Sequence, residues 1–204
     1  MAAPALVIVN PAAGGGRTAR LWPRLRDTLH DLHFRFEHAE TRVPGEATRL
    51  AADAARRGVP LIVAVGGDGT LNEVINGATS EDGRPRAAVG ALLTGRGRDA
   101  CRNLGLPRSP LVAARRLIEG REVERDLGLA RWPGGRRFFV NAVGAGFDAT
   151  VAAAAAQQGG GGTVAYLLAV GRSLRSYSPD ETRVERDGEL VSSGPLASVI
   201  VSNG

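Results

Sequence analysis

The sequence contains no lysine, a single cysteine and few aromatic residues. All 26 basic residues are arginine, and with 21 acidic residues they give a formal charge of +5. Because Cys101 stands alone, the chain cannot form an internal disulfide, which fits a reducing compartment. Aromatic residues amount to 4% of the chain, too few for the stacking surfaces that bind single-stranded nucleic acids. Acidic residues also interrupt the arginines along the chain, so we expect no nucleic-acid partner.

Long apolar runs are missing as well. No run approaches the roughly 20 residues that a membrane-spanning helix needs, and the first ten residues lack the basic segment of a secretory signal. We therefore expect a cytoplasmic protein, with any membrane contact peripheral and at the inner face. Arginine binds phosphates and carboxylates through two parallel hydrogen bonds, so partners that carry phosphate are favoured. A chain of 204 residues suffices for one core, or for a domain and a half.

Short apolar strands alternate with helical patterns over the first 120 residues. Such alternation is typical of a parallel sheet with right-handed crossovers, covered by helices on both faces. We therefore predict a three-layer α/β domain over residues 1–120. Its strands are expected at 5–9, 34–39, 61–65 and 88–93, and its helices at 17–32 (with Pro23 in the first turn), 44–57, just after residue 70, 99–104 and 110–119.

The pattern changes at residue 121. A hairpin is predicted from strands at 122–130 and 137–143, which flank a Pro-Gly-Gly turn. Helices are expected at 147–156 and 164–177, and strands at 182–186 and 196–202 with Asp187-Gly188 as a turn. Residues 121–204 are thus predicted to form a β-rich second domain. Since the sequence stops directly after a strand, which would leave that strand without a partner, we expect this domain to be incomplete.

The strongest local motif runs from Gly66 to Glu73, Gly-Gly-Asp-Gly-Thr-Leu-Asn-Glu, directly after an apolar strand. Glycines let the backbone approach a ligand closely, and the start of the following helix favours an anion. Asp68, held among these glycines, suits a metal–water network or the orientation of a hydroxyl group. Thr70 and Glu73 also fit a capping box that would start the helix. An ordinary strand–turn–helix is the alternative, but three glycines around one aspartate favour a phosphate site.

Two further glycine-rich loops are expected at the same edge of the sheet. One is 10–17, after the first strand, and the other is 94–99, after the fourth. In an open parallel sheet, the loops at the carboxyl ends of the strands face one crevice, where ligands bind. None of the three loops has the lysine or the spacing of a P-loop, and none matches the dinucleotide fingerprint of a Rossmann fold.

These motifs, in this order, resemble the diacylglycerol kinase catalytic-domain family, which includes bacterial diacylglycerol kinases, sphingosine kinases and ceramide kinases. The resemblance rests on Asn10-Pro11 with its trailing glycines, on 66–74, on Gly-Arg-Gly-Arg-Asp-Ala-Cys-Arg-Asn-Leu-Gly at 95–105, on 139–148 and on 199–204. NAD kinases share the Gly-Gly-Asp-Gly-Thr element, so that motif alone does not decide between the two families. The resemblance covers nearly the whole chain.

The resemblance implies an ATP-dependent lipid kinase, with a nucleotide-binding α/β domain followed by a β-sandwich that helps to bind lipid. Diacylglycerol would be the phosphate acceptor, with Mg²⁺ and ATP as cofactors, and a homodimer is left open. Asp68 and Asp99 would join the acidic network around magnesium and the phosphates as catalytic residues. The resemblance implies that three loops and one threonine line the nucleotide site: Asn10, Pro11, Ala12, Ala13, Gly14, Thr41, Gly66, Gly67, Asp68, Gly69, Thr70, Leu71, Asn72 and Arg96.

The sequence departs from the family pattern at several positions. Ala13 stands where the family often has serine, and Arg96 and Arg98 replace a threonine and an asparagine of the third loop. The family's catalytic base lies in a segment beyond residue 204. Two alternatives therefore remain: a non-catalytic nucleotide-binding or regulatory relative of these kinases, and an NAD kinase. The loop at Asn10-Pro11 and the segment at 146–148 speak against the NAD kinase.

Overall fold

The protein was analysed as a computed structural model that describes residues 3–95, 99–147, 149–150 and 177–203. The chain divides into two compact units. The first comprises residues 1–141 with 203–204, and the second comprises residues 142–202. The boundary of a lipid-binding domain at residue 121 stays a prediction, as does its β-sandwich. No helix in the described part of the chain is both long enough and apolar enough to cross a membrane.

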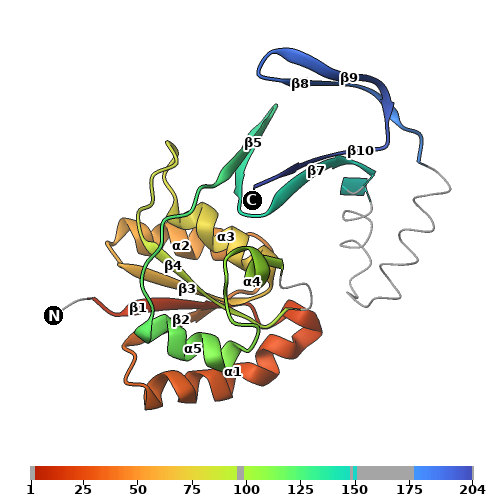
Figure 1. Ribbon diagram of the computed structural model, residues 1–204. Coiled ribbons are helices and arrows are strands. Elements are labelled where there is room, and N and C mark those ends of the chain that lie inside the picture. The colour runs from red at the N-terminus through yellow and green to blue at the C-terminus, as the bar shows by residue number, and fades with distance from the viewer. Residues whose placement is uncertain (1–2, 96–98, 148, 151–176, 204) are drawn as a thin grey trace. The chain divides into compact units, whose positions relative to one another are not determined.

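The first unit follows the predicted alternation of strands and helices (Figure 1). Its elements are β1 (Ala5–Val9), α1 (Ala13–Asp31), β2 (Phe36–Glu40), α2 (Glu46–Arg56), β3 (Leu61–Gly66), α3 (Asp68–Ala78), β4 (Ala88–Leu93), α4 (Asp99–Asn103), α5 (Pro110–Glu119), β5 (Gly128–Trp132) and β6 (Gly135–Phe139). Pro23 is an exception, because it lies in the interior of α1 instead of its first turn. Three glycines with positive φ, Gly14, Gly15 and Gly16, interrupt the first turn of α1, so its regular right-handed part begins after Gly16, at the predicted start.

The four strands β1 to β4 pair in parallel in the order β2-β1-β3-β4. β1 and β3 are buried along almost their whole length, as continuous apolar strands between two helical layers should be. From β1, the chain first forms β2 on one side of β1 and then crosses to form β3 on the other side of β1. The carboxyl ends of β1 and β3 therefore form a switch point, which is where open α/β sheets bind ligands.

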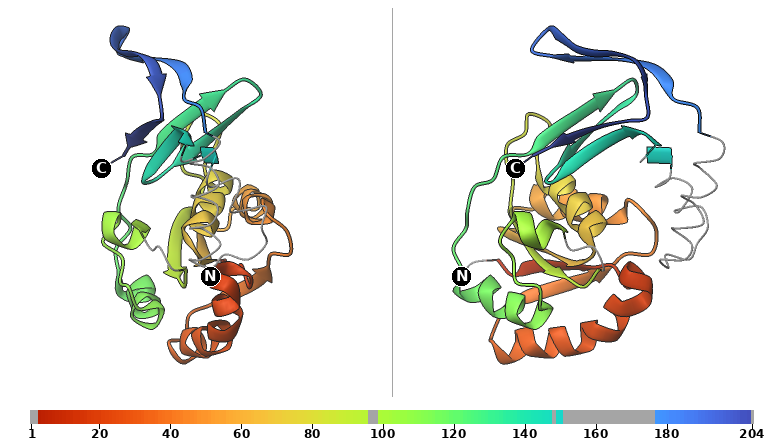
Figure 2. Two further views of the ribbon diagram at one scale, coloured as in Figure 1. Left: turned by 90° about the vertical axis from the view of Figure 1, so that its right-hand side faces the viewer. Right: turned by 45° about the vertical axis from the view of Figure 1, so that its right-hand side comes forward.

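Helices cover both faces of the parallel sheet (Figures 1 and 2). Alternate residues of the strands supply two separate cores, one on each face. On one face, Ile8 and Ile62 pack with α2, α3 and α4. On the other face, Val7 and Val63 pack with Trp22 of α1 and with α5. The alanine-rich face of α2 lets α3 approach closely. The predicted three-layer α/β architecture is thus confirmed.

The hairpin β5–β6 is confirmed, with the predicted turn at its tip and an antiparallel register from Gly128↔Phe139 to Trp132↔Gly135. The predicted start of the first strand at residue 122 is wrong, because residues 121–127 form no strand. This segment is dense in charge and its Val123 is 69% exposed, so it has no face to bury. The single strand predicted at 137–143 is instead two strands, separated where Asn203 bonds the carbonyls of Val140 and Asn141.

The second unit contains antiparallel strands. They are β7 (Ala142–Gly146), β8 (Asp180–Arg186), β9 (Glu189–Leu196) and β10 (Ser198–Ser202), with β7 paired to β10 and β8 to β9. The predicted turn at Asp187-Gly188 joins β8 to β9, and both residues have positive φ. The helices predicted at 147–156 and 164–177 fall almost entirely outside the described residues.

Candidate functional site

The three glycine-rich loops come together at the carboxyl edge of the parallel sheet, as predicted. β1, β3 and β4 are consecutive neighbours in the sheet, and each leads directly into one of the loops. The loop after β3 is the shortest, because α3 begins at Asp68 with Gly67 as its N-cap. No described side chain caps this helix end, so no side chain among the described residues accepts from the N–H groups of its first turn through a cap.

The second and third loops touch through their backbones. A Cβ atom placed on Gly95 would lie 2.8 Å from the Cα of Gly67, a distance that real side chains do not tolerate. The carbonyl of Gly66 accepts hydrogen bonds from the backbone N–H groups of Thr94 (2.7 Å) and Gly95 (3.2 Å). Glycine is therefore required here by close packing between the two loops.

The first and second loops are joined by a side chain. The Asn10 amide donates to Thr70 Oγ1 at 3.0 Å, and its Oδ1 accepts the backbone N–H of Ala12 at 3.1 Å. The predicted capping box at the start of α3 is wrong, because Thr70 lies inside the first turn and faces Asn10. Asn10 therefore fixes the path of the first loop relative to the helix that follows the second.

A buried pair of hydroxyl groups joins the first and third loops. Thr18 and Thr94 are 0% and 1% exposed, and their Oγ1 atoms lie 2.5 Å apart. Thr94 Oγ1 also lies 3.1 Å from the Gly66 carbonyl, and Thr18 Oγ1 lies 3.2 Å from the carbonyl of Ala13. The hydroxyls satisfy each other within an otherwise apolar layer, so the three loops form one hydrogen-bonded assembly.

The two predicted catalytic carboxylates sit at the starts of neighbouring helices. Asp68 opens α3, and its Oδ1 accepts the backbone N–H of Ala100 at 3.1 Å. Asp99 opens α4, is 65% exposed at its side chain, and pairs with Arg102 at 3.5 Å. Asp68 thus binds the residue next to Asp99, which brings the two acidic positions to the same part of the edge. An exposed ion pair of this length is weak and leaves Asp99 available to a ligand.

Thr41 also lies at this edge. Its backbone N–H donates to the carbonyl of Val9 at 2.8 Å, and its side chain is buried. The loop that follows is held by two carboxylates: Glu46 accepts the N–H of Arg42 at 2.7 Å, and Glu73 accepts the N–H of Gly45 at 3.1 Å.

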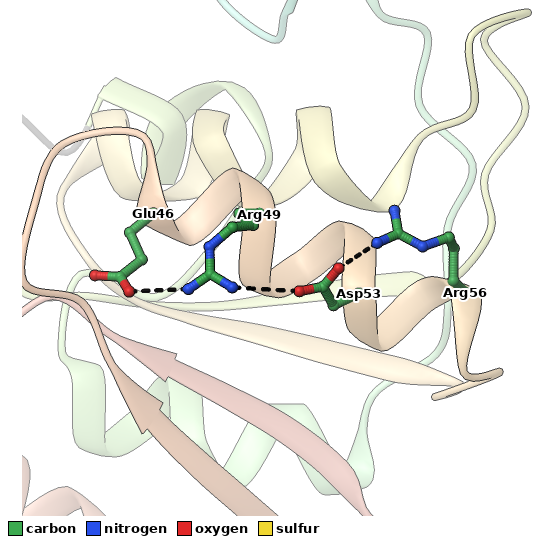
Figure 3. A network of polar contacts seen from close by, with 4 residues as sticks. All are labelled: Glu46, Arg49, Asp53 and Arg56. Carbon is green, nitrogen blue, oxygen red and sulfur yellow. Dashed lines mark hydrogen bonds and ion pairs between the residues drawn. The ribbon is translucent and has the colours of Figure 1, made fainter.

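Glu46 also begins a chain of ion pairs along α2 (Figure 3). Arg49 lies 3.0 Å from Glu46 and 3.5 Å from Asp53, which in turn pairs with Arg56. The hydrogen bond from the Arg42 backbone, assisted by Arg49, lowers the pKa of Glu46 from its ordinary value of 4.5. The carboxylate that starts α2 is thus kept charged, which suits a helix N-terminus.

The structure separates the other predicted site residues. Asn72 points away from the loops, since its amide donates to the carbonyl of Phe138 on β6 at 2.9 Å and its Oδ1 accepts from Arg137 at 2.7 Å. The side chain of Leu71 is buried in the core, so this side chain is not available to a ligand. Arg96 lies outside the described residues. The remaining predicted residues belong to the three loops or lie beside them: Pro11, Ala12, Ala13, Gly14 and Gly69.

Two residues that organise the site, Thr18 and Glu73, are not among the site residues predicted from the sequence. Thr18 carries a readable signal, because it is a polar residue in line with Trp22, Leu25 and Leu29 on the apolar face of its helix. Glu73 is part of the motif after β3, but its bond to Gly45 joins elements 28 residues apart. Sequence spacing alone does not reveal that contact.

Among the described residues, the carboxylates and other ligand groups do not gather into a set of three that could hold a metal ion. The site therefore offers backbone N–H groups, a helix N-terminus and two separate carboxylates at a sheet switch point. Backbone N–H groups and a helix N-terminus at a switch point are the features with which open α/β sheets generally bind anionic ligands.

The chain belongs to the diacylglycerol kinase catalytic domain family, whose model matches residues 4–130. It is 32% identical over 189 residues to the diacylglycerol kinase of Bacillus subtilis, a match that covers 91% of this chain and 60% of that protein. A second relative is "Probable lipid kinase YegS-like" of Serratia proteamaculans, 33% identical over 150 residues, with 73% of this chain and 47% of the relative covered.

A solved structure of a diacylglycerol kinase from Bacillus anthracis has the same fold. It superposes with a TM-score of 0.68 at 27% identity, covering 98% of this chain and 64% of that one. The chain thus spans about three fifths of the length of the first curated relative. The resemblance read from the motifs is confirmed, because the family model that matches is that of the diacylglycerol kinase catalytic domain.

Proposed function

We propose that this chain carries the nucleotide-binding part of a lipid kinase, which transfers the γ-phosphate of ATP to the hydroxyl group of diacylglycerol. The observation that carries the proposal is the meeting of three glycine-rich loops at the switch point between β1 and β3. Membership of the diacylglycerol kinase family supports the reaction class, and the names of the relatives support diacylglycerol as the acceptor.

The phosphates of ATP would lie against the loops after β1, β3 and β4. The contact between Gly67 and Gly95 keeps the second and third loops free of side chains where they meet, so a phosphate can reach backbone N–H groups. The N-terminus of α3 adds its partial positive charge. Asn10, Thr18 and Thr94 would act as positioning residues, because their hydrogen bonds hold the loops together.

The donor set fits Mg²⁺ that arrives with ATP. Mg²⁺ is usually bound by one or two carboxylates together with phosphates and water. Asp68 has a second carboxylate oxygen beside the Oδ1 that accepts the N–H of Ala100. Asp68 and Asp99 would hold the ion through its water shell. When bound, Mg²⁺ neutralises the negative charge that develops on the phosphate oxygens.

In the transfer step, the lipid hydroxyl oxygen forms a bond to the γ-phosphorus while the bond to the β–γ bridging oxygen breaks. The products are phosphatidic acid and ADP, and the hydroxyl proton passes to a base. Phosphoryl transfer depends mainly on positioning and on charge neutralisation, which is the contribution proposed for this unit.

The full-length protein should transfer the radioactive phosphate of [γ-³²P]ATP to diacylglycerol in mixed micelles that contain Mg²⁺. Asp68→Asn should lower the rate by roughly a hundredfold or more, since one of the two carboxylates proposed to hold Mg²⁺ loses its charge. Asp53→Asn, which removes an exposed carboxylate of α2, is the matched control and should keep the rate.

The same assay separates the alternatives. ATP binding without transfer to any lipid would overturn the kinase proposal in favour of a non-catalytic nucleotide-binding protein. Phosphate transfer to NAD in place of lipid would overturn the proposal that diacylglycerol is the acceptor. An unchanged rate in Asp68→Asn would overturn the role given to Asp68.

A further inference from the structure

The tip of the β5–β6 hairpin exposes a tryptophan. Trp132 ends β5 and is 52% exposed. A Cβ atom on Gly135 would lie 2.7 Å from the indole ring, so the ring lies across the hairpin backbone at that glycine. One side of the indole is thereby supported, and the rest faces solvent. Tryptophan combines a large apolar body with a polar N–H group, which suits the boundary between water and lipid.

Arginines lie next to this ring in the sequence but on the other face of the hairpin, because successive strand residues point to opposite faces. Arg131 and Arg136 stand directly opposite each other across the hairpin, although like charges in opposed positions destabilise a sheet. Arg136 reaches the loop before β4, where it donates to the Glu81 carbonyl at 2.8 Å and lies 3.5 Å from the Glu81 carboxylate. Within the described part of the chain, no ion pair with a carboxylate is formed by Arg131.

The loop before β4 adds two more arginines, Arg84 and Arg86, both exposed. We name Arg84, Arg86, Arg131, Trp132 and Arg136 the hairpin patch. Two carboxylates adjoin the patch: Glu81 pairs with Arg136, and Asp82 lies 3.3 Å from Arg84. The other two guanidinium groups, those of Arg86 and Arg131, give the patch its excess of positive charge. Repulsion between Arg131 and Arg136 lowers the stability of the hairpin. An anionic partner bound to both side chains would offset that repulsion.

We propose that the hairpin patch docks on the surface of a lipid bilayer that contains anionic phospholipids. The guanidinium groups bind the lipid phosphates through paired hydrogen bonds, while the indole enters the headgroup layer. The patch is a protruding turn, whereas proteins bind single-stranded nucleic acid in a basic groove with several stacked aromatics. A bilayer is therefore the favoured partner.

The proposal deepens the proposed function, because a kinase whose acceptor is a membrane lipid has to reach the bilayer. Its contacts do not involve the nucleotide loops. If vesicle binding is lost while ATP binding is retained, the defect lies in the hairpin patch alone. If ATP binding is lost while vesicle binding is retained, the defect lies in the nucleotide site alone.

The chain contains two tryptophans, and Trp22 is 5% exposed in the core. In Trp22→Phe, the emission spectrum reports Trp132 alone. Vesicles of phosphatidylcholine mixed with phosphatidylglycerol should shift this emission to the blue, and lipids brominated in their acyl chains should quench it. Vesicles of phosphatidylcholine alone, soluble glycerophosphate and a single-stranded oligonucleotide should not. If Trp22→Phe does not fold, the difference spectrum between the wild type and Trp132→Phe gives the same readout.

Arg131→Gln with Arg136→Gln should lower the vesicle partition coefficient roughly tenfold, and added salt should weaken wild-type binding. The control is Arg115→Gln with Arg116→Gln, which removes the same charge from the exposed side of α5 and should bind as the wild type does. Equal losses in both double variants, equal binding to neutral vesicles, or a blue shift with the oligonucleotide alone would each overturn the proposal.

Discussion

The Cα of Gly67 lies 2.8 Å from the position that a Cβ on Gly95 would occupy. This contact brings the loops after β3 and β4 together without an intervening side chain. Gly95→Ala should therefore lower the free energy of unfolding by about 1–3 kcal/mol, the usual cost of overpacking a rigid contact. Urea unfolding followed by circular dichroism measures the change.

Gly69→Ala provides the matched control in the neighbouring loop, because a Cβ there meets no atom within 4 Å. Alanine in the first turn of α3 should leave stability unchanged or raise it by about 0.5 kcal/mol. If Gly95→Ala were as stable as Gly69→Ala, close packing would not be the reason for glycine at position 95.

The hydroxyl pair of Thr18 and Thr94 should behave as a coupled unit. Each threonine changed to valine alone leaves its buried partner with one bond fewer, whereas the double substitution removes both groups together. The double variant should therefore be less destabilised than the sum of the singles by about 1 kcal/mol. Free energies of unfolding for the four proteins test this, and additive effects would contradict the contact. Thr28→Val, at a half-buried site on α1 where the hydroxyl bonds only the backbone carbonyl of Arg24, controls for helix propensity.

Glu46 should make stability depend on pH. The hydrogen bond from Arg42 lowers the pKa of this carboxyl from 4.5 in the folded protein. Its contribution is therefore fully present above pH 4.5 and is lost as the pH falls through the lowered pKa. Glu46→Gln should lose less stability on acidification below pH 4.5 than the wild type does. The exposed Glu37→Gln on β2 serves as control, and equal acid sensitivity of all three proteins would contradict the prediction.

Asn76 should stabilise the edge of β6 that is not paired with β5, because its side chain makes the hydrogen bonds that a neighbouring strand would otherwise make. Its Oδ1 accepts the backbone N–H of Phe138 at 2.8 Å, and its amide donates to the Phe138 carbonyl at 2.9 Å. Asn76→Ala should speed hydrogen exchange at the Phe138 N–H by about tenfold or more, because that donor loses its acceptor. Asn103→Ala, which removes one exposed amide bond to Asn141, should not. Unchanged exchange in Asn76→Ala would rule out this edge contact.

The sequence is sufficient to predict the sheet and the three loops, because continuous apolar strands and glycine clusters are local signals. It does not predict the direction of Asn72, which lies in the motif yet bonds Phe138, 66 residues away. Nor does it reveal that Thr70 pairs with Asn10 in place of capping its own helix. Both outcomes depend on contacts between distant segments, which local spacing does not encode. The charged segment at 121–127 fails as a strand for a related reason, since strand formation needs a face to bury.

The central claim is that the three loops together bind the phosphates of ATP, and amide chemical shifts test it most directly. On titration with Mg²⁺ and ATP, the backbone N–H signals of Gly14, Gly69 and Gly95 should shift together with a single dissociation constant. The N–H of Gly188, in the turn between β8 and β9, should stay in place. Shifts confined to other parts of the chain, or none at saturating nucleotide, would contradict the account.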